Sequence, residues 1–481
     1  MRHKADKINE SATALSTVRA THELPLQKDL PEGWSWKTMG EISEVIGGGT
    51  PRTNVPEYYN SGNIAWITPA DLSGYIDKYI SHGSRFITET GLKNSSARLM
   101  PAGTVLYTSR APIGYVAIAK NPVSTNQGFK SFLLKAGILP DYVYWYLKGS
   151  KNLAESYASG TTFMELSGTK AKQLPIPIAP IDQQKRIVAE IEKQFSRLDE
   201  AVAALKRIWA NLKRYKASVL KAAVEGKLTE QWRKEHPDIE PASALLKHIL
   251  VERKKKWEEK NPGKKYKEPA TPATSNLPEL PKGWVWVTLQ QIFQSVTDGD
   301  HQPPPQTKSG VPFLVIGNVR TGKLDFTDTR YVSQEYFAQI TEERIPRKGD
   351  ILYTLVGSYG IALLVDTSRE FCIQRHMAIL KPTRSLNTRY FMHALDTSFV
   401  YRRATEIATG TAQKTVPLAG LREIAVPFPP LQEQQKIIED VDSRLSVAEE
   451  IEAAVETNLK RADRLRQAIL KKAFSGNLGR V

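Results

Sequence analysis

The sequence has very little cysteine: Cys372 is the single one among 481 residues. One thiol excludes a disulfide framework and a metal cluster held by several thiolates. No two of the eight histidines stand four residues apart, as a helical metal-binding pair would require. Runs of about 18 apolar residues are absent, so no membrane-spanning helix is predicted. Residues 1–29 lack the apolar core of a secretory signal, and we expect a flexible N-terminal extension in a reducing, cytoplasmic setting.

The usual marks of an enzyme are missing too. The sequence contains no Gly-x-x-x-x-Gly-Lys-Ser/Thr loop, no Asn-Pro-Pro-Tyr/Phe tetrapeptide of amino-methyltransferases and no convincing nuclease pattern of paired carboxylates with a lysine. The segment "IGGGTPR" (46–52) lacks Rossmann spacing, and we interpret it as a turn that lets the backbone approach a ligand. No arrangement of Ser, His and Asp indicates a catalytic triad. The sequence therefore favours a binding protein that is not an enzyme.

Acidic residues are too few to balance the basic ones. Lys and Arg number 67 against 51 Asp and Glu, which gives a formal net charge of +16 and a pI near 9.5. Such an excess favours a polyanionic partner, most often nucleic acid, although a merely basic protein without that partner is the alternative. The length predicts about three domains.

What the sequence does have is a duplication. The segment at 30–36 returns at 280–286, and those at 175–192 and 218–229 return at 425–442 and 468–479, all with an offset of 250. Between them "GTVLYT" (103–108) matches "GDILYT" (349–354) with an offset of 246, as loops of unequal length on a shared fold allow. The four matched pairs are "LPEGWSW" and "LPKGWVW", "GTVLYT" and "GDILYT", "PIPIAPIDQQKRIVAEIE" and "AVPFPPLQEQQKIIEDVD", and "SVLKAAVEGKLT" and "AILKKAFSGNLG".

Each copy begins with a globular part, over 30–179 and 280–429. Short apolar runs between Gly, Pro, Ser and Asn predict compact domains of mixed α and β structure, with strands at "NIAWIT", "TVLYTS", "YVAIA", "PFLVIG", "ILYTLV" and "IALLV". The segments "DYVYWYLKGSKNL" and "TRYFMHALDTSFVYRRA" predict helices. Residues 230–279 stand between the copies and predict a short amphipathic helix followed by a linker. The basic cluster 253–256 could touch DNA, but a solvated face is the commoner explanation.

Each copy ends in one long helix, over 180–229 and 430–479. Apolar residues recur at alternating steps of three and four, which predicts two helices of about 45 residues, or about 65 Å, that pair with each other. Pro180 and Pro430 precede the two patterns, and Gly226 and Gly476 follow them. Polar residues interrupt the apolar series at Gln184, Lys216, Gln434, Glu452 and Arg466. The side chains expected to pack between the helices include Val188, Ile191, Phe195, Leu198, Leu205, Leu212, Ile438, Val441, Leu445, Val455 and Leu459.

These motifs together resemble the specificity subunit of Type I restriction–modification enzymes. The resemblance rests on the repeated "LP-[EK]-GW-x-W" and "G-x-[VI]-L-Y-T", on the Pro-rich end of each globule and on "EGKLTEQWRKEHP" (225–237), and it spans residues 30–479. It implies an α+β fold in which two target-recognition domains are separated by an antiparallel coiled pair of long helices, with a pseudo-twofold internal repeat. Each domain would read one half of a bipartite, asymmetric site in double-stranded DNA, and the helices would set the spacer between the halves.

The resemblance also implies partners. Two methyltransferase subunits and the restriction or translocase subunits would bind this chain in a bacterial or archaeal cytoplasm. S-adenosylmethionine, ATP and Mg would be used by those subunits, with no cofactor or metal bound here. A free-standing coiled-coil DNA-binding protein is the alternative. A fused methyltransferase is disfavoured because residues 1–29 and 230–279 are too few for that fold, and a scaffold without nucleic acid leaves the charge unexplained.

We expect loops to carry the DNA contacts, with basic side chains on phosphates and polar side chains on base edges. For each residue a phosphate contact or a structural hydrogen bond is the alternative, and Trp34, Trp36, Trp284 and Trp286 are expected to be core anchors. The candidates in the first copy are Thr50, Arg52, Ser109, Arg110, Asn126, Gln127, Thr161 and Thr162. Those in the second copy are Asp298, Gly299, His301, Ser358, Tyr359, Gln374, Arg375, Thr411, Gln413 and Lys414.

Overall fold

The computed structural model describes residues 30–160, 164–299 and 304–478. The predictions for residues 1–29, Thr161, Thr162 and His301 lie outside these residues. The described residues form two compact units, of which unit 1 comprises those up to 207 and from 455 onward and unit 2 comprises those between 208 and 454. Among the described residues, none of the helices is both long enough and apolar enough to cross a lipid bilayer.

The globular part of unit 1 is built on a five-stranded sheet in the order β2-β9-β6-β7-β4 and a three-stranded sheet in the order β5-β3-β8. The predicted strands at 63–68, 104–109 and 115–119 are confirmed as parts of β3, β6 and β7. The elements are β1 (Ser35–Thr38), α2 (Met39–Ile42), β2 (Ser43–Gly47), β3 (Ile64–Ile67), β4 (Tyr79–Ile80), β5 (Arg85–Ile87), α3 (Glu89–Lys93), β6 (Val105–Ser109), β7 (Ile113–Ala119), β8 (Ser124–Thr125), β9 (Lys130–Leu134), α4 (Pro140–Gly149), α5 (Lys151–Tyr157), α6 (Gly168–Gln173) and β10 (Pro175–Ile178).

The globular part of unit 2 repeats this plan with a four-stranded sheet, β12-β18-β15-β16, and a three-stranded sheet, β14-β13-β17. The predicted strands at 312–317, 351–356 and 361–365 are confirmed as β13, β15 and β16. The elements are α8 (Glu230–Glu235), α9 (Ala242–Lys260), β11 (Val285–Thr288), α10 (Leu289–Ile292), β12 (Phe293–Asp298), β13 (Val311–Leu314), β14 (Arg330–Val332), α11 (Gln334–Gln339), β15 (Ile351–Thr354), β16 (Ala362–Leu364), β17 (Cys372–Ile373), β18 (Met377–Pro382), α12 (Thr388–Leu395), α13 (Ser398–Ile407), α14 (Leu418–Glu423) and β19 (Ala425–Phe428).

Each predicted helix late in a globule is in fact two helices, α4 with α5 and α12 with α13. A buried hydroxyl stands at each break. The Ser150 Oγ donates to the Tyr146 carbonyl at 2.6 Å, and the Thr397 Oγ1 accepts from the Val400 amide as the N-cap of α13. Such side chains offer the backbone an alternative to continued helix, which the apolar pattern did not reveal.

The repeated motifs at the two ends of each globule meet in a two-stranded sheet. β1 pairs antiparallel with β10, and β11 pairs with β19 in the equivalent register, Ser35 opposite Ile178 and Val285 opposite Phe428. The prolines of β10 and β19 are tolerated because these strands have one free edge. The opening motif and the Pro-rich closing motif are therefore the two strands that close each globule.

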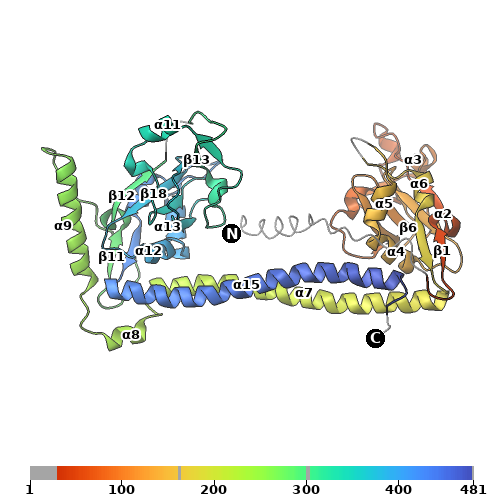
Figure 1. Ribbon diagram of the computed structural model, residues 1–481. Coiled ribbons are helices and arrows are strands. Elements are labelled where there is room, and N and C mark those ends of the chain that lie inside the picture. Colours follow the sequence, from red (N-terminus) through yellow and green to blue (C-terminus); the bar gives the residue numbers. More distant parts are fainter. Residues whose placement is uncertain (1–29, 161–163, 300–303, 479–481) are drawn as a thin grey trace. The chain divides into compact units, whose positions relative to one another are not determined.

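The long helices are α7 (Ile181–Val224) and α15 (Leu431–Phe474), each of 44 residues, beginning directly after the predicted prolines. Within each unit they lie side by side (Figure 1) and antiparallel. Arg466 contacts Asp199 in unit 1, whereas Lys216 pairs with Glu452 at 2.6 Å in unit 2, so residues late in one helix face residues early in the other. The predicted antiparallel pair of helices is thereby confirmed.

The side chains expected to pack between the helices differ in burial. Two apolar residues of the predicted series, Ile181 and Leu431, are the first residues of the helices and are 36% and 45% exposed, although Gln184 and Gln434 in the same turns are buried. The predicted packing residues that are buried are Ile191, Phe195, Leu212, Ile438, Val441 and Val455. Those that are half-buried are Val188, Leu198, Leu205, Leu445 and Leu459.

The last turns of each long helix pack into the core of the globule that precedes the other long helix. In unit 1, Leu470, Ala473 and Phe474 of α15 are buried, and the Phe474 ring meets the Tyr142 and Tyr146 rings edge-on at 5.0 and 5.1 Å. In unit 2, α7 supplies the equivalent group, which is Val219, Leu220, Ala223 and Val224. Each core therefore contains the start of its own helix and the end of the other one.

The glutamines that interrupt the apolar series join each globule to its helix. The buried Gln184 side chain accepts from the Leu139 amide at 3.0 Å and donates to the Ala179 carbonyl at 2.8 Å. In unit 2, the buried Gln434 accepts from the Asn387 amide at 3.2 Å and donates to the Pro429 carbonyl at 2.9 Å. Because both side-chain atoms are bonded, burial leaves neither unsatisfied.

The residue before each of these glutamines accepts a hydrogen bond from a tryptophan of the opening motif. The Trp34 Nε1 donates to the Gln183 Oε1 at 2.8 Å, and the Trp284 Nε1 donates to the Glu433 Oε2 at 2.7 Å. The Glu433 carboxylate is fully buried and also accepts from Thr229 at 2.7 Å and from Arg233. The prediction of a core anchor is confirmed for Trp284, which is buried, whereas Trp34 is half-buried and packs against the core of unit 1. Trp36 and Trp286 are also half-buried.

The insert between the copies belongs to unit 2. The predicted amphipathic helix is confirmed as α9, which runs beside β11 and β12 (Figure 1) and buries Ala242, Leu245 and Ile249. The segment that follows has neither helix nor strand over 264–274 but is hydrogen-bonded to the globule, since the Ala270 carbonyl accepts from the Thr288 hydroxyl at 3.0 Å. Within the basic cluster, Arg253 donates to the Phe293 and Gln294 carbonyls.

A double-mutant cycle tests the ion pair that crosses the helices of unit 2. The side chains of Lys216 and Glu452 are only 25% and 27% exposed. Glu452→Leu alone should lower the free energy of unfolding by about 1–2 kcal/mol, because it leaves a half-buried ammonium group unpaired. Adding Lys216→Met should restore most of the loss. Urea unfolding followed by circular dichroism measures both, and additive effects would mean that the ion pair contributes nothing.

Burial of His393 in unit 2 predicts a dependence of stability on pH. Burial, with a smaller effect of the Arg389 guanidinium, lowers the pKa of His393 to about 4. In the unfolded chain this imidazole is protonated below about pH 6.5, whereas in the folded chain it stays neutral down to about pH 4. The free energy of unfolding should therefore fall by about 2–3 kcal/mol as the pH drops from about 6.5 to 4.

His393→Phe should flatten that fall, measured as the melting temperature between pH 7 and 4.5. Asp442, whose carboxylate lies 3.8 Å from the imidazole and whose pKa burial raises, is kept in the variant, so its own titration is present in both proteins. The exposed His248 provides the matched control. His248→Phe should leave the wild-type slope intact, and an equal flattening in both variants would contradict the assignment.

Candidate nucleic-acid interface

In unit 1, the turn after β2 lies against the turn after β8. The Gly49 amide donates to the Thr125 carbonyl at 2.9 Å, and the Asn126 amide donates to the Ile67 carbonyl at 3.0 Å. Glycine is required at the point of approach, since a Cβ on Gly48 would come within 1.8 Å of the Asn126 carbonyl oxygen. The glycine-rich segment is thus a turn held against another part of the backbone, as its composition suggested.

Side chains from both turns reach the surface there. The Thr50 hydroxyl is hydrogen-bonded to the Gln127 side-chain oxygen, and Gln127 and Arg52 are exposed. Asn126 is half-buried and accepts from the Gly128 amide at 2.9 Å, so its side chain also shapes the turn. Four of the predicted residues are therefore brought together on one surface by elements some 75 residues apart in the sequence.

The loop after β6 continues this surface. Ser109 is fully buried and donates to the Gly128 carbonyl at 3.1 Å, so it supports the turn after β8 and does not reach solvent. Arg110, the next residue, is half-buried and lies 3.6 Å from Glu165. The same carboxylate lies 3.7 Å from Lys130 at the start of β9. Two cations therefore share one carboxylate beside the candidate turns.

Unit 2 places its own loops in the same way. A Cβ on Gly299, at the end of β12, would come within 2.1 Å of the Ile373 carbonyl oxygen, and the Gln374 amide donates to the Leu314 carbonyl at 3.1 Å. Arg344 donates to the Gly299 carbonyl at 3.2 Å and lies 3.8 Å from the Asp298 carboxylate. Asp298 is accordingly buried in an ion pair with its side chain only 12% exposed.

The second pair of loops in unit 2 joins 356–360 to 409–415. The Gly357 amide donates to the Lys414 carbonyl at 2.9 Å, and Thr409 and Thr415 exchange backbone hydrogen bonds at 2.8 Å. Ser358 is exposed, whereas the Tyr359 ring stacks on Tyr401 at 5.5 Å. The other predicted residues that are exposed in these loops or in the turn after β17 are Arg375, Thr411, Gln413 and Lys414.

A histidine links the two groups of loops in unit 2. The His376 carbonyl accepts from the Leu355 amide at 2.8 Å, just before the loop 356–360. Burial, with the neighbouring Arg375 guanidinium, lowers the pKa of His376, so the ring is neutral near pH 7. The permanent positive charge on this surface therefore comes from Arg375 and Lys414 and not from the histidine.

The two surfaces use the same backbone frame with different side chains. The bridge between Ser159 and Glu165 in unit 1 recurs between Thr409 and Thr415 in unit 2, at the offset of 250. Yet Glu165, which binds two cations, is replaced by a threonine, and the hydrogen-bonded Thr50 and Gln127 have no like pair in the described part of unit 2.

Sequence reasoning missed three charged residues that this geometry brings in. Glu165 and Lys130 lie beside Arg110, and Arg344 holds the end of β12. The repeat could have indicated Glu165, because "SGTTFMELSGTK" and "TGTAQKTVPLAG" align at 159–170 and 409–420. No sequence signal indicated Arg344, since its partners come from elements more than 40 residues away.

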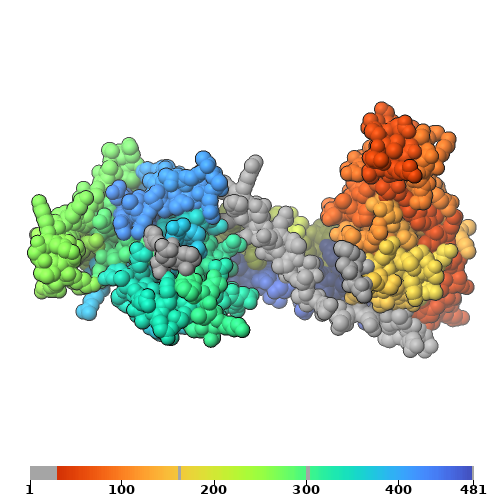
Figure 2. Space-filling view, turned by 90° about the horizontal axis from the view of Figure 1, so that it is seen from above, coloured from red at the N-terminus to blue at the C-terminus, as the bar shows by residue number. Residues whose placement is uncertain are grey.

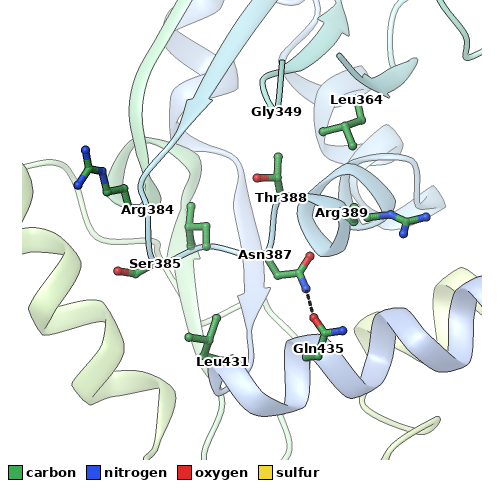
Figure 3. A pocket seen from close by; sticks show the side chains of 10 residues that line it. Gly349, Leu364, Arg384, Ser385, Asn387, Thr388, Arg389, Leu431 and Gln435 are labelled. Carbon is green, nitrogen blue, oxygen red and sulfur yellow. Dashed lines mark hydrogen bonds between the residues drawn. The ribbon is translucent and has the colours of Figure 1, made fainter. Parts of the chain in front are cut away.

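A shallow depression lies elsewhere on unit 2, where α15 begins (Figure 3). Leu431 and Gln435 of α15 line it together with residues of the globule, and the Asn387 side chain donates to Gln435 at 3.1 Å. Gly349, before β15, lines it, whereas the candidate loops follow the other end of that strand. Its lining, as far as the structure describes it, includes no carboxylate, histidine or thiol, so it has the character of a seam between globule and helix.

Comparison with known proteins agrees with this architecture. The family described as the Type I restriction modification DNA specificity domain matches residues 31–212 and 281–461, once in each copy. The MjaIX specificity subunit of Methanocaldococcus jannaschii is 30% identical over 461 residues, covering 93% of this chain and 94% of that protein. The EcoKI specificity subunit of Escherichia coli is 24% identical over 471 residues, covering 93% and 90%.

Two solved structures share the fold. A chain in a structure of the type I R-M system has a TM-score of 0.61 at 20% identity, covering 94% of this chain and 100% of that one. The HsdS subunit from Thermoanaerobacter tengcongensis has a TM-score of 0.51 at 21% identity, covering 95% and 100%. With the family matched in both copies and a relative 30% identical along almost its whole length, the chain belongs to the specificity subunits of Type I restriction–modification enzymes.

Proposed function

We propose that each globule reads one half of a bipartite, asymmetric site in double-stranded DNA through the surface formed by its loops. The observation that carries this proposal is the repetition of one backbone frame with different side chains. In unit 1 the frame presents Thr50, Arg52 and Gln127, and in unit 2 it presents Arg375, Gln413 and Lys414. Equal frames would dock alike on the duplex, whereas unequal side chains would bind different bases.

The exposed side chains suit the two kinds of contact that such a reader needs. Gln127 and Gln413 can each form two hydrogen bonds with an adenine edge, and Arg52 and Arg375 can each do so with guanine. Arg110, which is half-buried beside Glu165, would contact a phosphate, and such a contact positions the duplex without reading its sequence. The two glutamines and the two arginines that can bind base edges would thus provide the specificity. The surrounding cations would provide the affinity.

We propose further that α7 and α15 set the spacer between the two half-sites. Each is continuous over 44 residues, or about 66 Å at 1.5 Å per residue. Each also takes part in both units, and a continuous helix is far stiffer than a flexible linker of equal length. The spacer would then be a property of the helices and the sequence preference a property of the loops.

The helices also carry apolar side chains that the described chain leaves partly exposed. Ile208 and Tyr215 are 42% and 41% exposed and lie seven residues apart on one face of α7, and Val447 and Ile451 are 54% and 40% exposed on one face of α15. Exposed apolar stripes of this kind mark surfaces for a partner. We assign them, all within unit 2, to the docking of a methyltransferase subunit.

Catalysis would belong to those partners. Methyl transfer with S-adenosylmethionine, and cleavage with ATP and Mg, would take place on the methyltransferase and restriction subunits, in the cytoplasm where the cell keeps its DNA. This chain would supply recognition alone. A free-standing DNA-binding protein is the rival, and it would purify without a methyltransferase subunit.

Substitution of one DNA-reading residue in each globule tests whether each globule reads its own half-site. Arg52→Ala should weaken binding to the correct site by about 1–3 kcal/mol and relax the sequence preference in one half-site, and Arg375→Ala should do the same only in the other half. Mapping of methylated adenines across a genome, with each variant in place of the wild type, measures both effects and the spacer length at once.

Arg110→Ala is the matched comparison, because its expected effect is a uniform loss of affinity across all sequences with a smaller salt dependence. Relaxation of both half-sites by either reading variant, or a change of spacer, would contradict the proposal.

A charge placed in each apolar stripe tests the docking surface. Ile208→Asp with Val447→Asp should reduce co-purification of the methyltransferase subunit by at least about tenfold, since an interface must then desolvate two carboxylates. The control is Lys213→Asp, an exposed position on the same helix. Unaltered circular dichroism would establish that the variants fold, and undiminished co-purification would exclude these stripes as the docking site.

A further inference from the structure

The outer face of α9 and the segment after it carry lysines that take no part in the fold. Lys247, Lys254 and Lys255 are exposed on α9, and Lys264, Lys265 and Lys267 are exposed in the segment that follows. In the part of the chain that the structure describes, these six form no ion pair, although three exposed carboxylates, Glu258, Glu259 and Glu268, lie among them. Figure 2 shows α9 and this segment, in green, along one flank of unit 2.

Other basic residues of α9 are used by the fold, so the two sets can be told apart. Arg253 binds backbone carbonyls at the start of β12, Lys256 pairs with Glu252 at 2.6 Å, and Lys260 pairs with Glu343 at 3.2 Å. These side chains lie on the face of α9 turned to the globule or beside it. Lys254 and Lys255 lie on the face turned away from it, where their charge stabilises nothing within the described chain.

A continuous set of contacts leads from the end of α9 to the candidate reading surface. Lys260, the last residue of α9, pairs with Glu343, whose carbonyl accepts from the Thr297 hydroxyl at 2.6 Å. The next residue, Arg344, donates to the carbonyl of Gly299. The C-terminal end of α9 therefore lies beside the end of β12 from which the candidate loops project.

The segment after α9 stays at this end of the helix. The chain turns at 261–263, where the Lys264 amide donates to the Asn261 carbonyl at 3.1 Å, and the Tyr266 ring then packs on Trp257 of α9 with centroids 5.4 Å apart. Lys264 and Lys265 are thereby held next to the last turns of α9. The free lysines gather on the flank of the surface to which we assign DNA reading.

We propose that this lysine flank binds the phosphates of duplex DNA immediately outside the half-site read by unit 2. Lysine is a compact, mobile charge that binds phosphate without base identity, so the flank would add affinity and no sequence preference. In the part of the chain that the structure describes, unit 1 has no counterpart of this flank, because residues 230–279 stand outside the two repeated segments, 30–229 and 280–479. The proposal rests on the DNA-reading function proposed above.

The experiment compares duplexes of different length with the full chain, purified with its partner subunits. A duplex extended by one helical turn beyond the half-site of unit 2 should bind about fivefold or more tightly than the minimal site, whereas the same extension beyond the other half-site should change little. A variant with Lys254, Lys255, Lys264 and Lys265 all changed to Gln should lose the advantage of the extension. Its salt dependence should also be smaller, by about 0.9 in the logarithmic slope for each phosphate that the variant no longer neutralises.

The control changes the same four lysines to Arg, which keeps the charge and should bind the extended duplex as the wild type does. An advantage that is equal on both sides, or one that survives in the Gln variant, would overturn the proposal. So would a Gln variant that loses its partner subunits while its salt dependence is unchanged, since the flank would then be a protein-docking surface. Failure of the wild type to prefer its site over random duplex would instead refute the reading function itself, which keeps the two failures distinct.

Discussion

The structure depends on the way in which each globule shares its hydrophobic core with both long helices. The start of α7 is buried under the globule of unit 1 together with the end of α15, and the converse holds in unit 2. Burial of large apolar side chains such as Phe474 contributes about 1.5–3 kcal/mol each. Because each core takes these side chains from the end of the other long helix, neither core is complete without the antiparallel pairing, and the pairing is stabilised by each core.

Polar groups then determine which pairing is formed. An apolar seam alone would tolerate shifts along the helices, whereas a polar group at a seam position has to meet its partner or stay unsatisfied. Lys216 meets Glu452, and Arg466 meets Asp199. The glutamines at the two helix starts bond the loops of their own globules, so the helices are fixed to the globules as well as to each other. The polar residues that interrupt the apolar pattern therefore specify how the two helices pair.

Much of this could be predicted because the repeat and the heptads are properties of the sequence itself. The helix starts, the main strands and α9 follow from local pattern, and the pairing of the helices follows from their equal length. The reading surface was harder. Loops were the right place to look, but the burial of Ser109 depends on the Gly128 carbonyl, and the role of Arg344 depends on a hydrogen bond with Gly299, and neither interaction has a local signature. The helix breaks at Ser150 and Thr397 were missed because the sequence does not distinguish a hydroxyl that bonds the backbone from one that faces solvent on a continuous helix.

The discontinuity of unit 1 has a consequence for the order in which the polypeptide matures on the ribosome. Unit 2 comprises one uninterrupted stretch, 208–454, whereas unit 1 needs residues from both extremes of the chain. The N-terminal globule is translated before unit 2, yet its core lacks Leu470, Ala473 and Phe474 until those residues have been synthesised. The later globule therefore has all of its own residues before the earlier one does. A stop codon before position 470 would leave the core of the first globule permanently incomplete, although unit 2 would have all of its residues.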